Sequence, residues 1–483
     1  MLMGLLACSR SEQGPVHRPE QGMNLIVISL DTLRADHLGC YGYGRNTSPA
    51  LDDLAARSIL FENVYSQADM TAPSHGTIFT GRYPSAHGLE NLRAKSGADG
   101  VPEEGLDPSL PILAEILGRN GWSSAGVADG GPMTGGQGLE RGFGTWSSRM
   151  TPVGKRIEEG REALDALRSD ESPWFLFWHT YEIHAPYLPS PEWDLWQDPA
   201  NPARAAVLEI GGHNVTQQLR DGTPVQLQMV KDLNAHGVDS DLARAVTDLY
   251  DGGIAETDLH LGLWLEELEA AGILDSTILV ILSDHGEELG EHGSLGHQAK
   301  LFEERLRVPW IIHLPGDRLA GMKVQMRAGL VDVLPTLLDL LGVAAPTGLD
   351  GRSLVDAMEG RRMERLPVFS EARWRKRKRW SVSVRSGTGA FGYRVMPGIP
   401  RSKVGPLFLY DLGTDPGTHQ NLVGEDVDPS DEKRMRHLPL LLSTFVDRQR
   451  RADQARSHGA ETEVDEATRR ELENLGYVDD EDG

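Results

Sequence analysis

Asn24-Leu-Ile-Val-Ile-Ser-Leu30 is an unbroken apolar run rich in β-branched residues. Such a run is typical of a strand that is buried on both faces of a parallel sheet. Further strand-like runs lie at residues 60–64, 123–128, 174–179, 277–283 and 308–314, and amphipathic helical segments alternate with them at 49–58, 110–120, 241–271 and 331–341. This alternation predicts an α/β fold with a large, mostly parallel sheet sandwiched by helices.

The composition of the chain changes beyond about residue 345. Short alternating segments at 380–385, 391–395 and 407–412 predict a small C-terminal antiparallel sheet. We therefore expect an N-terminal tether over 1–22, a catalytic α/β domain over 23–345, an α+β subdomain over 346–428 and a helical C-terminus with an acidic tail over 429–483. Residues 189–239, polar and weakly periodic, are interpreted as an insertion at one rim of the catalytic domain.

Charge and cysteine content narrow the class of protein. The 483 residues carry a formal charge of −24, which argues against a broad nucleic-acid-binding surface but allows a local pocket for an anionic substrate. The basic run Arg373-Trp-Arg-Lys-Arg-Lys-Arg379 fits either a charged edge strand or recognition of such a substrate. Nothing in the sequence indicates the oligomeric state.

The N-terminus carries a possible lipid-attachment site. Leu5-Leu-Ala-Cys8 resembles a bacterial lipobox, and the polar stretch 9–22 would serve as a tether. The four residues before it are too short and uncharged for a complete signal peptide. Two interpretations stay open: an exported protein anchored through Cys8, in the periplasm or at the cell surface, or a plain flexible N-terminus.

The stretch Asp69-Met-Thr-Ala-Pro-Ser-His-Gly-Thr-Ile-Phe-Thr-Gly81 places a hydroxyl, that of Thr71, just before a predicted helix that begins at Pro73. The free amide groups of a first helical turn can bind a tetrahedral anion. Thr71 is therefore a candidate nucleophile toward a phosphate or sulfate ester. A threonine hydroxyl is a weak nucleophile, so it needs a base or a metal ion.

Candidate metal ligands follow two of the predicted strands. Asp31 comes directly after residue 30, and Asp284-His285 follows the strand at 277–283. Each could be structural, but the carboxyl ends of parallel strands meet at one edge of a sheet, so these groups and Thr71 can converge on one divalent cation. Ca²⁺, Mn²⁺ and Zn²⁺ all remain possible. A second metal would need further imidazoles, and the spacings do not select a set among His179, His260, His292 and His313.

Together, these motifs resemble the sulfatase family of the alkaline phosphatase superfamily over nearly the whole chain. The matching stretches are 24–36, Thr71-Ala-Pro-Ser with Thr80-Gly81, His184-Ala-Pro-Tyr187, Ser283-Asp-His-Gly-Glu287, Gly290-Glu-His-Gly293, 303–309, and Leu409-Tyr-Asp-Leu with Asp415-Pro416 and Asn421-Leu422. The resemblance implies an alkaline phosphatase-like fold and assigns Asp31, Asp284 and His285 to the metal and Thr71 to the nucleophile position. It also places His184 beside the bound anion and His297 where many members carry a substrate-binding lysine.

Departures from the family pattern shape the functional hypothesis. Family sulfatases carry a cysteine or serine that is oxidised to formylglycine, a conversion that Thr71 cannot undergo; His75 replaces the usual arginine as a candidate substrate ligand, and Thr32 replaces a second aspartate. We therefore expect a metal-dependent hydrolase of small-molecule or glycan anionic esters, closer to the phosphodiesterase and phosphonate-hydrolase branches, with His184 or His297 protonating the leaving group. The alternative is a lipid-anchored binding protein that has lost turnover.

Overall fold

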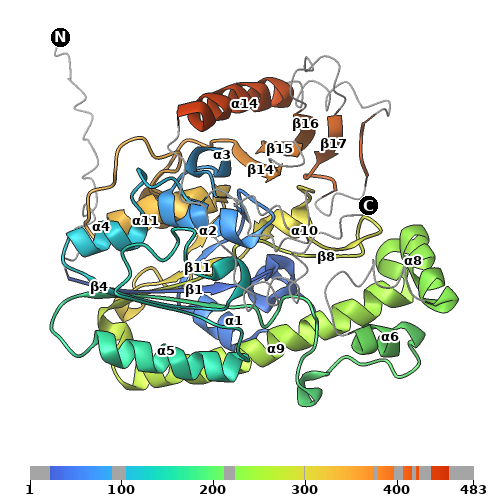
Figure 1. Ribbon diagram of the computed structural model, residues 1–483, viewed down its shortest axis with the longest axis horizontal. Helices are drawn as coiled ribbons and strands as arrows, with labels where there is room; N and C mark the ends of the chain where they lie inside the picture. Colours follow the sequence, from blue (N-terminus) through green and yellow to red (C-terminus); the bar gives the residue numbers. More distant parts are fainter. Residues whose placement is uncertain are drawn as a thin grey trace, which may run out of the picture.

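Strand β1 (Asn24–Leu30) lies inside an eight-stranded sheet with the order β12-β2-β11-β7-β1-β6-β4-β5 (Figure 1). The computed structural model describes residues 22–89, 105–210, 223–297, 300–374, 379–395, 406–415, 420–423 and 437–455. On either side, β1 pairs in parallel with β6 (Trp174–Thr180) and β7 (Thr277–Leu282). The carboxyl ends of the three strands therefore share one edge of the sheet. Strands β4 (Ser123–Ala128) and β5 (Thr145–Ser148) extend it in parallel.

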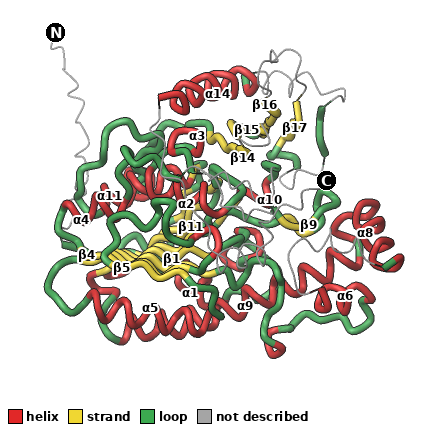
Figure 2. The backbone as a smooth tube through the Cα atoms, in the orientation of Figure 1, coloured by secondary structure: helices red, strands yellow, loops and turns green. Residues whose placement is uncertain are grey.

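Helices cover both faces of this sheet, as Figures 1 and 2 show. Leu25 and Val27 pack in one apolar core with residues of α2 (Thr71–Thr80), α4 (Leu113–Arg119) and α11 (Val333–Leu340). Ile26 and Ile28, which alternate with them, pack in a second core with residues of α1 (Pro49–Ala56), α5 (Val153–Leu167) and α9 (Asp241–Ala270). Two-sided burial is what the continuous apolar run predicted, and the predicted sandwich is confirmed.

Two of the predicted strands each divide into two. The run near 60–64 forms β2 (Ile59–Phe61) in the large sheet and β3 (Val64–Tyr65) in a separate three-stranded sheet. The run at 308–314 likewise divides into β10 (Arg307–Val308), which pairs with β3, and β11 (Trp310–His313). Strand β11 is antiparallel to β7, because the described part of the connection holds only short elements and no crossover helix. The sheet is thus mixed.

A second, four-stranded antiparallel sheet contains β14 (Val368–Trp374), β15 (Arg379–Ser386), β16 (Gly389–Val395) and β17 (Pro406–Asp411). The sequence predicted this sheet but missed β14. Helix α14 (Leu438–Ala455) covers it, and Phe445 stacks on Phe369 with ring centroids 4.4 Å apart. Cys8, most of the basic run and the acidic tail lie outside the described residues.

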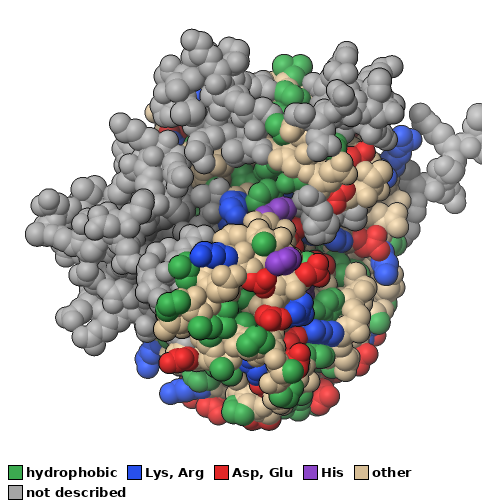
Figure 3. Space-filling view, turned by 90° about the vertical axis from the view of Figure 1, so that its right-hand side faces the viewer, with side chains coloured by type: hydrophobic (Ala, Val, Ile, Leu, Met, Phe, Trp, Pro, Cys, Tyr) green, Lys and Arg blue, Asp and Glu red, His purple; other side chains and the backbone are tan. Residues whose placement is uncertain are grey.

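The expected insertion contains helices α6 (Pro202–Ile210) and α8 (Pro224–His236), and residues 211–222 are not described. Within the described ranges, every helix is too short or too polar to cross a membrane. On the face shown in Figure 3, basic side chains lie dispersed among acidic ones. The remaining short elements are α3 (Pro84–His87), α10 (Glu303–Leu306), α12 (Val355–Met358), β8 (Glu288–Leu289), β9 (Leu295–Gly296), β12 (Lys323–Val324) and β13 (Ala328–Gly329).

Candidate active site and metal centre

Thr71 contacts residues from two strand ends at the carboxyl edge of the large sheet. Its hydroxyl donates a hydrogen bond to Asp31 Oδ2 over 3.2 Å and lies 3.4 Å from His285 Nε2. All three side chains are fully buried. Asp31 follows β1 directly, and His285 follows β7 after Asp284. The convergence predicted from the shared carboxyl edge of parallel strands is therefore present in the fold.

The helix that carries Thr71 begins earlier than the sequence suggested. Helix α2 starts at Thr71 itself, so Pro73 is its third residue and Thr71 lies within its first turn. The amide after Pro73, that of Ser74, donates to the Met70 carbonyl over 3.1 Å. The expectation that amides after Pro73 form an anion pocket is therefore wrong, because the first of them is already used in the helix. The positive end of the helix dipole still points toward Thr71.

Asp31, Asp284 and His285 form a group that suits a divalent cation. Their ligand atoms all lie within 4.8 Å of one another. Asp31 Oδ1 and Asp284 Oδ2 are buried without a hydrogen-bond partner, which is costly for a carboxylate unless something else neutralises it. Burial, and then the charge of Asp284, raises the pKa of Asp31 well above its usual range; burial also raises the pKa of Asp284. A bound cation would satisfy both orphaned oxygens.

His285 is prepared to act as a neutral ligand. Its Nδ1–H donates to the Gly286 carbonyl over 3.0 Å, which leaves Nε2 facing Thr71 and Asp284. Burial lowers the pKa of His285 well below its ordinary value, so the ring is uncharged near neutral pH. Two carboxylates, one imidazole and a hydroxyl make a donor set that accepts Zn²⁺, Mn²⁺ or Ca²⁺. The residues present therefore fit a metal ion.

A strained turn aims Asp31 into the site. Thr32 has φ of 56°, in the left-handed region that a β-branched residue rarely adopts. The Tyr250 hydroxyl holds this turn from α9: it donates to the Thr32 carbonyl over 2.8 Å and accepts from the Arg34 amide over 2.9 Å. The Thr32 amide in turn donates to Asp284 Oδ1 over 3.4 Å. Thr32, which stands where the family pattern has an aspartate, thus contributes through its backbone.

His75 lies beneath Thr71, inside the protein. Its Nδ1–H donates to the Thr71 carbonyl over 2.9 Å, and its Nε2 accepts from the Ser29 hydroxyl over 2.9 Å. Burial lowers the pKa of His75. Both ring nitrogens are used within the fold, which favours positioning of Thr71; the predicted contact of His75 with substrate stays a prediction. Ser29 was missed because an inward-facing serine within an apolar strand carries no sequence signal.

His184 and His297 lie together beside His285. Their ring centroids are 5.0 Å apart, and those of His297 and His285 are 4.4 Å apart. His297 Nδ1 lies 3.0 Å from Glu287 Oε1, while burial and then His297 lower the pKa of His184 to about 3. Glu287 belongs to the Asp-His-Gly-Glu motif but received no role from the sequence. The pairing of Glu287 with His297 could have been found only from the fold.

The other histidines considered for a second metal do not assemble into one site. His179 Nε2 lies 3.3 Å from Asp31 Oδ2 and belongs to the same centre. His292 pairs with Glu304, and His313 lies near Ser58. Among the described residues, the Asp31, Asp284 and His285 group is the one that meets the geometric condition for metal binding. A single metal ion is therefore the number that this part of the chain supports.

Comparison with known proteins agrees with this geometry. The family model described as Sulfatase matches residues 23–343. The chain belongs to the sulfatase family. A second model, described as N-sulphoglucosamine sulphohydrolase, C-terminal, matches residues 290–438. The chain is thus an ester hydrolase of a family that generally depends on a metal ion, as predicted.

Individual relatives include sulfatases and phosphonate hydrolases. The ulvan-active sulfatase of Formosa agariphila is 25% identical over 449 residues, covering 83% of this chain and 77% of the relative. A structure solved with its substrate D-glucosamine-2-N,6-O-disulfate superimposes with a TM-score of 0.69 at 19% identity, covering 90% of this chain and all of the other. The structure of the phosphonate monoester hydrolase of Agrobacterium radiobacter superimposes with a TM-score of 0.64 at 22% identity, covering 92% of this chain and 98% of the other.

Proposed function

We propose that this sulfatase-family enzyme uses Thr71 itself as the nucleophile and acts on phosphodiesters or phosphonate monoesters rather than on sulfate esters by the formylglycine route. The observation that carries the proposal is the contact of the Thr71 hydroxyl with both Asp31 and His285, at 3.2 and 3.4 Å. A hydroxyl placed among two candidate metal ligands is where an attacking oxygen belongs. Asp31, Asp284 and His285 would hold a divalent cation, which when bound lowers the pKa of an adjacent hydroxyl and polarises an ester oxygen.

The residues of the chain account for the remaining steps. Deprotonated Thr71 attacks the phosphorus in line with the leaving group, so that a Thr71–phosphorus ester forms as the bond to the leaving oxygen breaks. His75 holds the Thr71 carbonyl and thereby the direction of the hydroxyl. His184 and His297 both adjoin His285. Because the pKa of His184 is lowered to about 3, His297, which pairs with Glu287, is the one that can give a proton to the leaving oxygen. Water then hydrolyses the Thr71 ester.

The chemistry of threonine supports a function like that of the phosphodiesterase and phosphonate-hydrolase branches. Oxidation of its secondary alcohol would give a ketone, so Thr71 cannot supply the aldehyde hydrate of a formylglycine enzyme. Phosphonate monoester hydrolases stand among the structural neighbours, the second being that of Silicibacter pomeroyi, with a TM-score of 0.65 at 21% identity. The buried, unpaired carboxylate oxygens of the centre speak against the alternative of a binding protein without turnover, because such a cluster is costly to keep.

A substrate panel tests the proposal. Purified protein, stripped with chelator and reloaded separately with Mn²⁺, Zn²⁺ and Ca²⁺, is assayed with an aryl phosphate diester, an aryl phosphonate monoester and an aryl sulfate. We expect turnover of the first two with at least one metal, and loss of that turnover in Thr71→Ala but not in Thr71→Ser. Turnover of the aryl sulfate alone, or full activity of Thr71→Ala, would overturn the proposal.

A further inference from the structure

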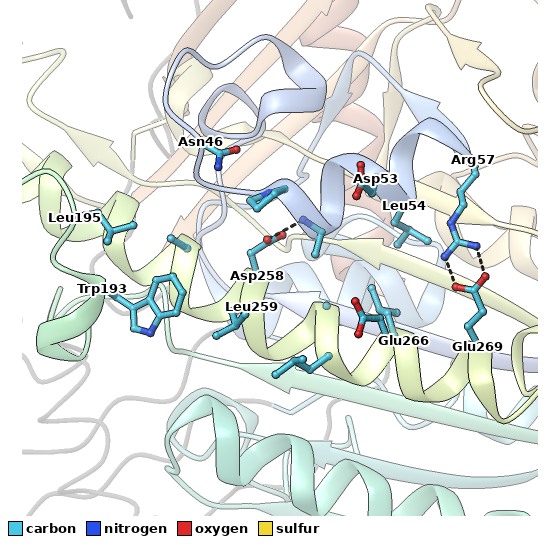
Figure 4. Close-up of a pocket in the computed structure, with 16 residues that line it drawn as sticks. Asn46, Asp53, Leu54, Arg57, Trp193, Leu195, Asp258, Leu259, Glu266 and Glu269 are labelled. Carbon is cyan, nitrogen blue, oxygen red and sulfur yellow. Dashed lines mark hydrogen bonds and ion pairs between the residues drawn. The ribbon is translucent and has the colours of Figure 1, made fainter.

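A groove lies between α1 and α9, and Thr71 is not among the residues that line it. It encloses about 570 Å³ along the outer side of α9, and the loop around Trp193 closes one end (Figure 4). None of the residues that line it belongs to the candidate metal centre. A volume of this size is typical of a site for a small molecule.

One wall of this groove is an exposed apolar stripe. Leu259 and Leu263 lie one turn apart on α9 and are 42% and 47% exposed, and Leu195 across from them is 51% exposed. Trp193 adds an indole ring at the same end (Figure 4). Apolar side chains gathered around a cavity in this way mark a binding surface more often than scattered single ones do. The stripe suits an alkyl chain or an aromatic ring.

The polar part of the groove carries uncompensated negative charge. Figure 4 shows Asp53 on α1 and Glu266 on α9 on opposite sides of the groove. Arg57 is the one basic residue of the lining, and Glu269 already binds its guanidinium through two hydrogen bonds of 3.0 and 2.7 Å. Within the described chain, neither Asp53 nor Glu266 has an ion-pair partner. An incoming cation would therefore meet two free carboxylates.

Asp258 is a further acidic residue of the groove lining, and it is buried. Its two carboxylate oxygens accept from the Ala50 and Leu51 amides, each over 2.9 Å, and so it caps the start of α1. Burial, and then the nearby charges of Asp52 and Asp53, raise the pKa of Asp258 to about 6 against the effect of these two hydrogen bonds. Asp52 and Asp53 thus add to the negative potential at this end of the groove.

We propose that this groove binds an amphipathic organic cation of small-molecule size. The apolar chain lies along Leu259 and Leu263, and the ammonium group lies between Asp53 and Glu266. Trp193 closes the apolar end of the groove. Both features are needed, because two exposed carboxylates alone would hold a cation only weakly in water. An anion of the same shape would meet like charges and bind poorly.

Calorimetric titration of the full chain tests this site with three probes: decyltrimethylammonium below its micelle concentration, decyl sulfate and tetramethylammonium. We expect saturable binding of one decyltrimethylammonium per chain. Decyl sulfate should bind weakly or not at all because its charge is negative, and tetramethylammonium because it has no long alkyl chain. The double variant Asp53→Asn/Glu266→Gln should weaken this binding at least tenfold, and Leu263→Ser should weaken it as well.

A matched double variant controls for overall charge. Glu162→Gln/Asp165→Asn removes the same two negative charges from exposed positions on α5 and should bind decyltrimethylammonium as the unaltered chain does. Equal loss in both double variants would show that only the net charge matters and would overturn the proposal. Binding of decyl sulfate as tight as that of decyltrimethylammonium would overturn it too, as would several equivalent sites per chain. Circular dichroism of each variant shows whether it has folded.

Discussion

Asp31 and Asp284 each bury one carboxylate oxygen without a hydrogen-bond donor, and the charge of Asp284 acts on Asp31. At the scale of single residues, this is the clearest sign of function in the molecule. A buried charge of this kind destabilises the fold unless a partner neutralises it. The chain therefore keeps a pair of acids that folding alone would not favour, and the proposed divalent cation would offset that cost.

Replacing Asp31 by Asn should separate the destabilisation by the two buried acids from the stabilisation by a bound metal ion. Without metal, removal of one charge relieves the repulsion with Asp284, and we expect Tm to rise by about 2 °C. Added Mn²⁺ or Zn²⁺ should raise Tm of the unaltered protein, because the folded state alone binds the ion, but should leave Tm of Asp31→Asn unchanged. Differential scanning calorimetry with chelator and with metal measures both. The exposed variant Asp165→Asn is the control, and a metal-induced rise that survives in Asp31→Asn would contradict the assignment.

Ser29 supports the site through His75. Its hydroxyl is the hydrogen-bond donor to His75 Nε2, 2.9 Å away in a fully buried setting. Ser29→Ala leaves that nitrogen without a partner, which should cost about 1–3 kcal/mol in the free energy of unfolding. Urea unfolding measures the loss, and Ser443→Ala on the exposed face of α14 should change stability by less than about 0.5 kcal/mol. Equal stability of the two variants would show that His75 needs no partner there.

At the scale of elements, the turn after β7 decides where two of the candidate ligands point. A Cβ atom added at Gly286 would lie 2.1 Å from the Glu304 carbonyl oxygen, and the Gly286 amide donates to the Arg305 carbonyl over 2.8 Å. The backbone of 284–286 is thus pressed against the segment around α10. Only glycine allows this approach, so the fit of two backbones fixes Asp284 and His285.

Gly286→Ala should therefore shift Asp284 and His285 as well as destabilise the fold. We expect a loss of about 1–3 kcal/mol in the free energy of unfolding and at least about tenfold weaker metal binding, measured by calorimetric titration. Gly118→Ala in α4 is the matched control, since nothing lies within 4 Å of its added Cβ; it should stabilise the protein by about 0.5–1 kcal/mol. Unchanged metal affinity in Gly286→Ala would mean that the turn is not what positions the ligands.

At the scale of the whole molecule, buried acids make stability depend on pH. Burial, and then the charges of Glu256 and Asp129, raise the pKa of Glu182 from 4.5 to about 7. The folded chain keeps this proton at a higher pH than the unfolded chain does. The contribution of Glu182 to stability is therefore most favourable below about pH 4.5 and declines as the pH rises through about 7.

Glu182→Gln should remove this decline. Its amide oxygen can still accept from the Val153 amide, as Glu182 does over 2.7 Å, but it carries no charge. At pH 8 we expect the variant to be more stable than the unaltered protein by about 2 kcal/mol, allowing for partial exposure of the side chain, with little difference at pH 4.5. Urea unfolding at several pH values gives the curve. Glu171→Gln, on an exposed turn, should follow the unaltered protein, and a constant difference across the pH range would contradict the assignment.

The buried strands and the residues at their ends could be predicted from sequence, because continuous apolar runs such as 24–30 require two-sided burial and parallel strands bring Asp31 and Asp284 to one edge. What the sequence could not give depends on contacts between distant segments. The division of 308–314 into two sheets, the start of α2 at Thr71 and the pairing of Glu287 with His297 are of this kind. The groove along α9 belongs here too, since α1 and α9 are far apart in the chain.

Mass spectrometry of an acid-quenched single turnover tests most directly whether Thr71 is the attacking group. Metal-loaded protein is mixed with the best substrate of the panel, quenched during the first turnover and digested. We predict that the peptide containing Thr71 gains the mass of the transferred phosphoryl or phosphonyl group, that the adduct maps to Thr71, and that Thr71→Ala shows none. Full single-turnover product release without any adduct, or an adduct on another residue, would contradict the proposed role of Thr71.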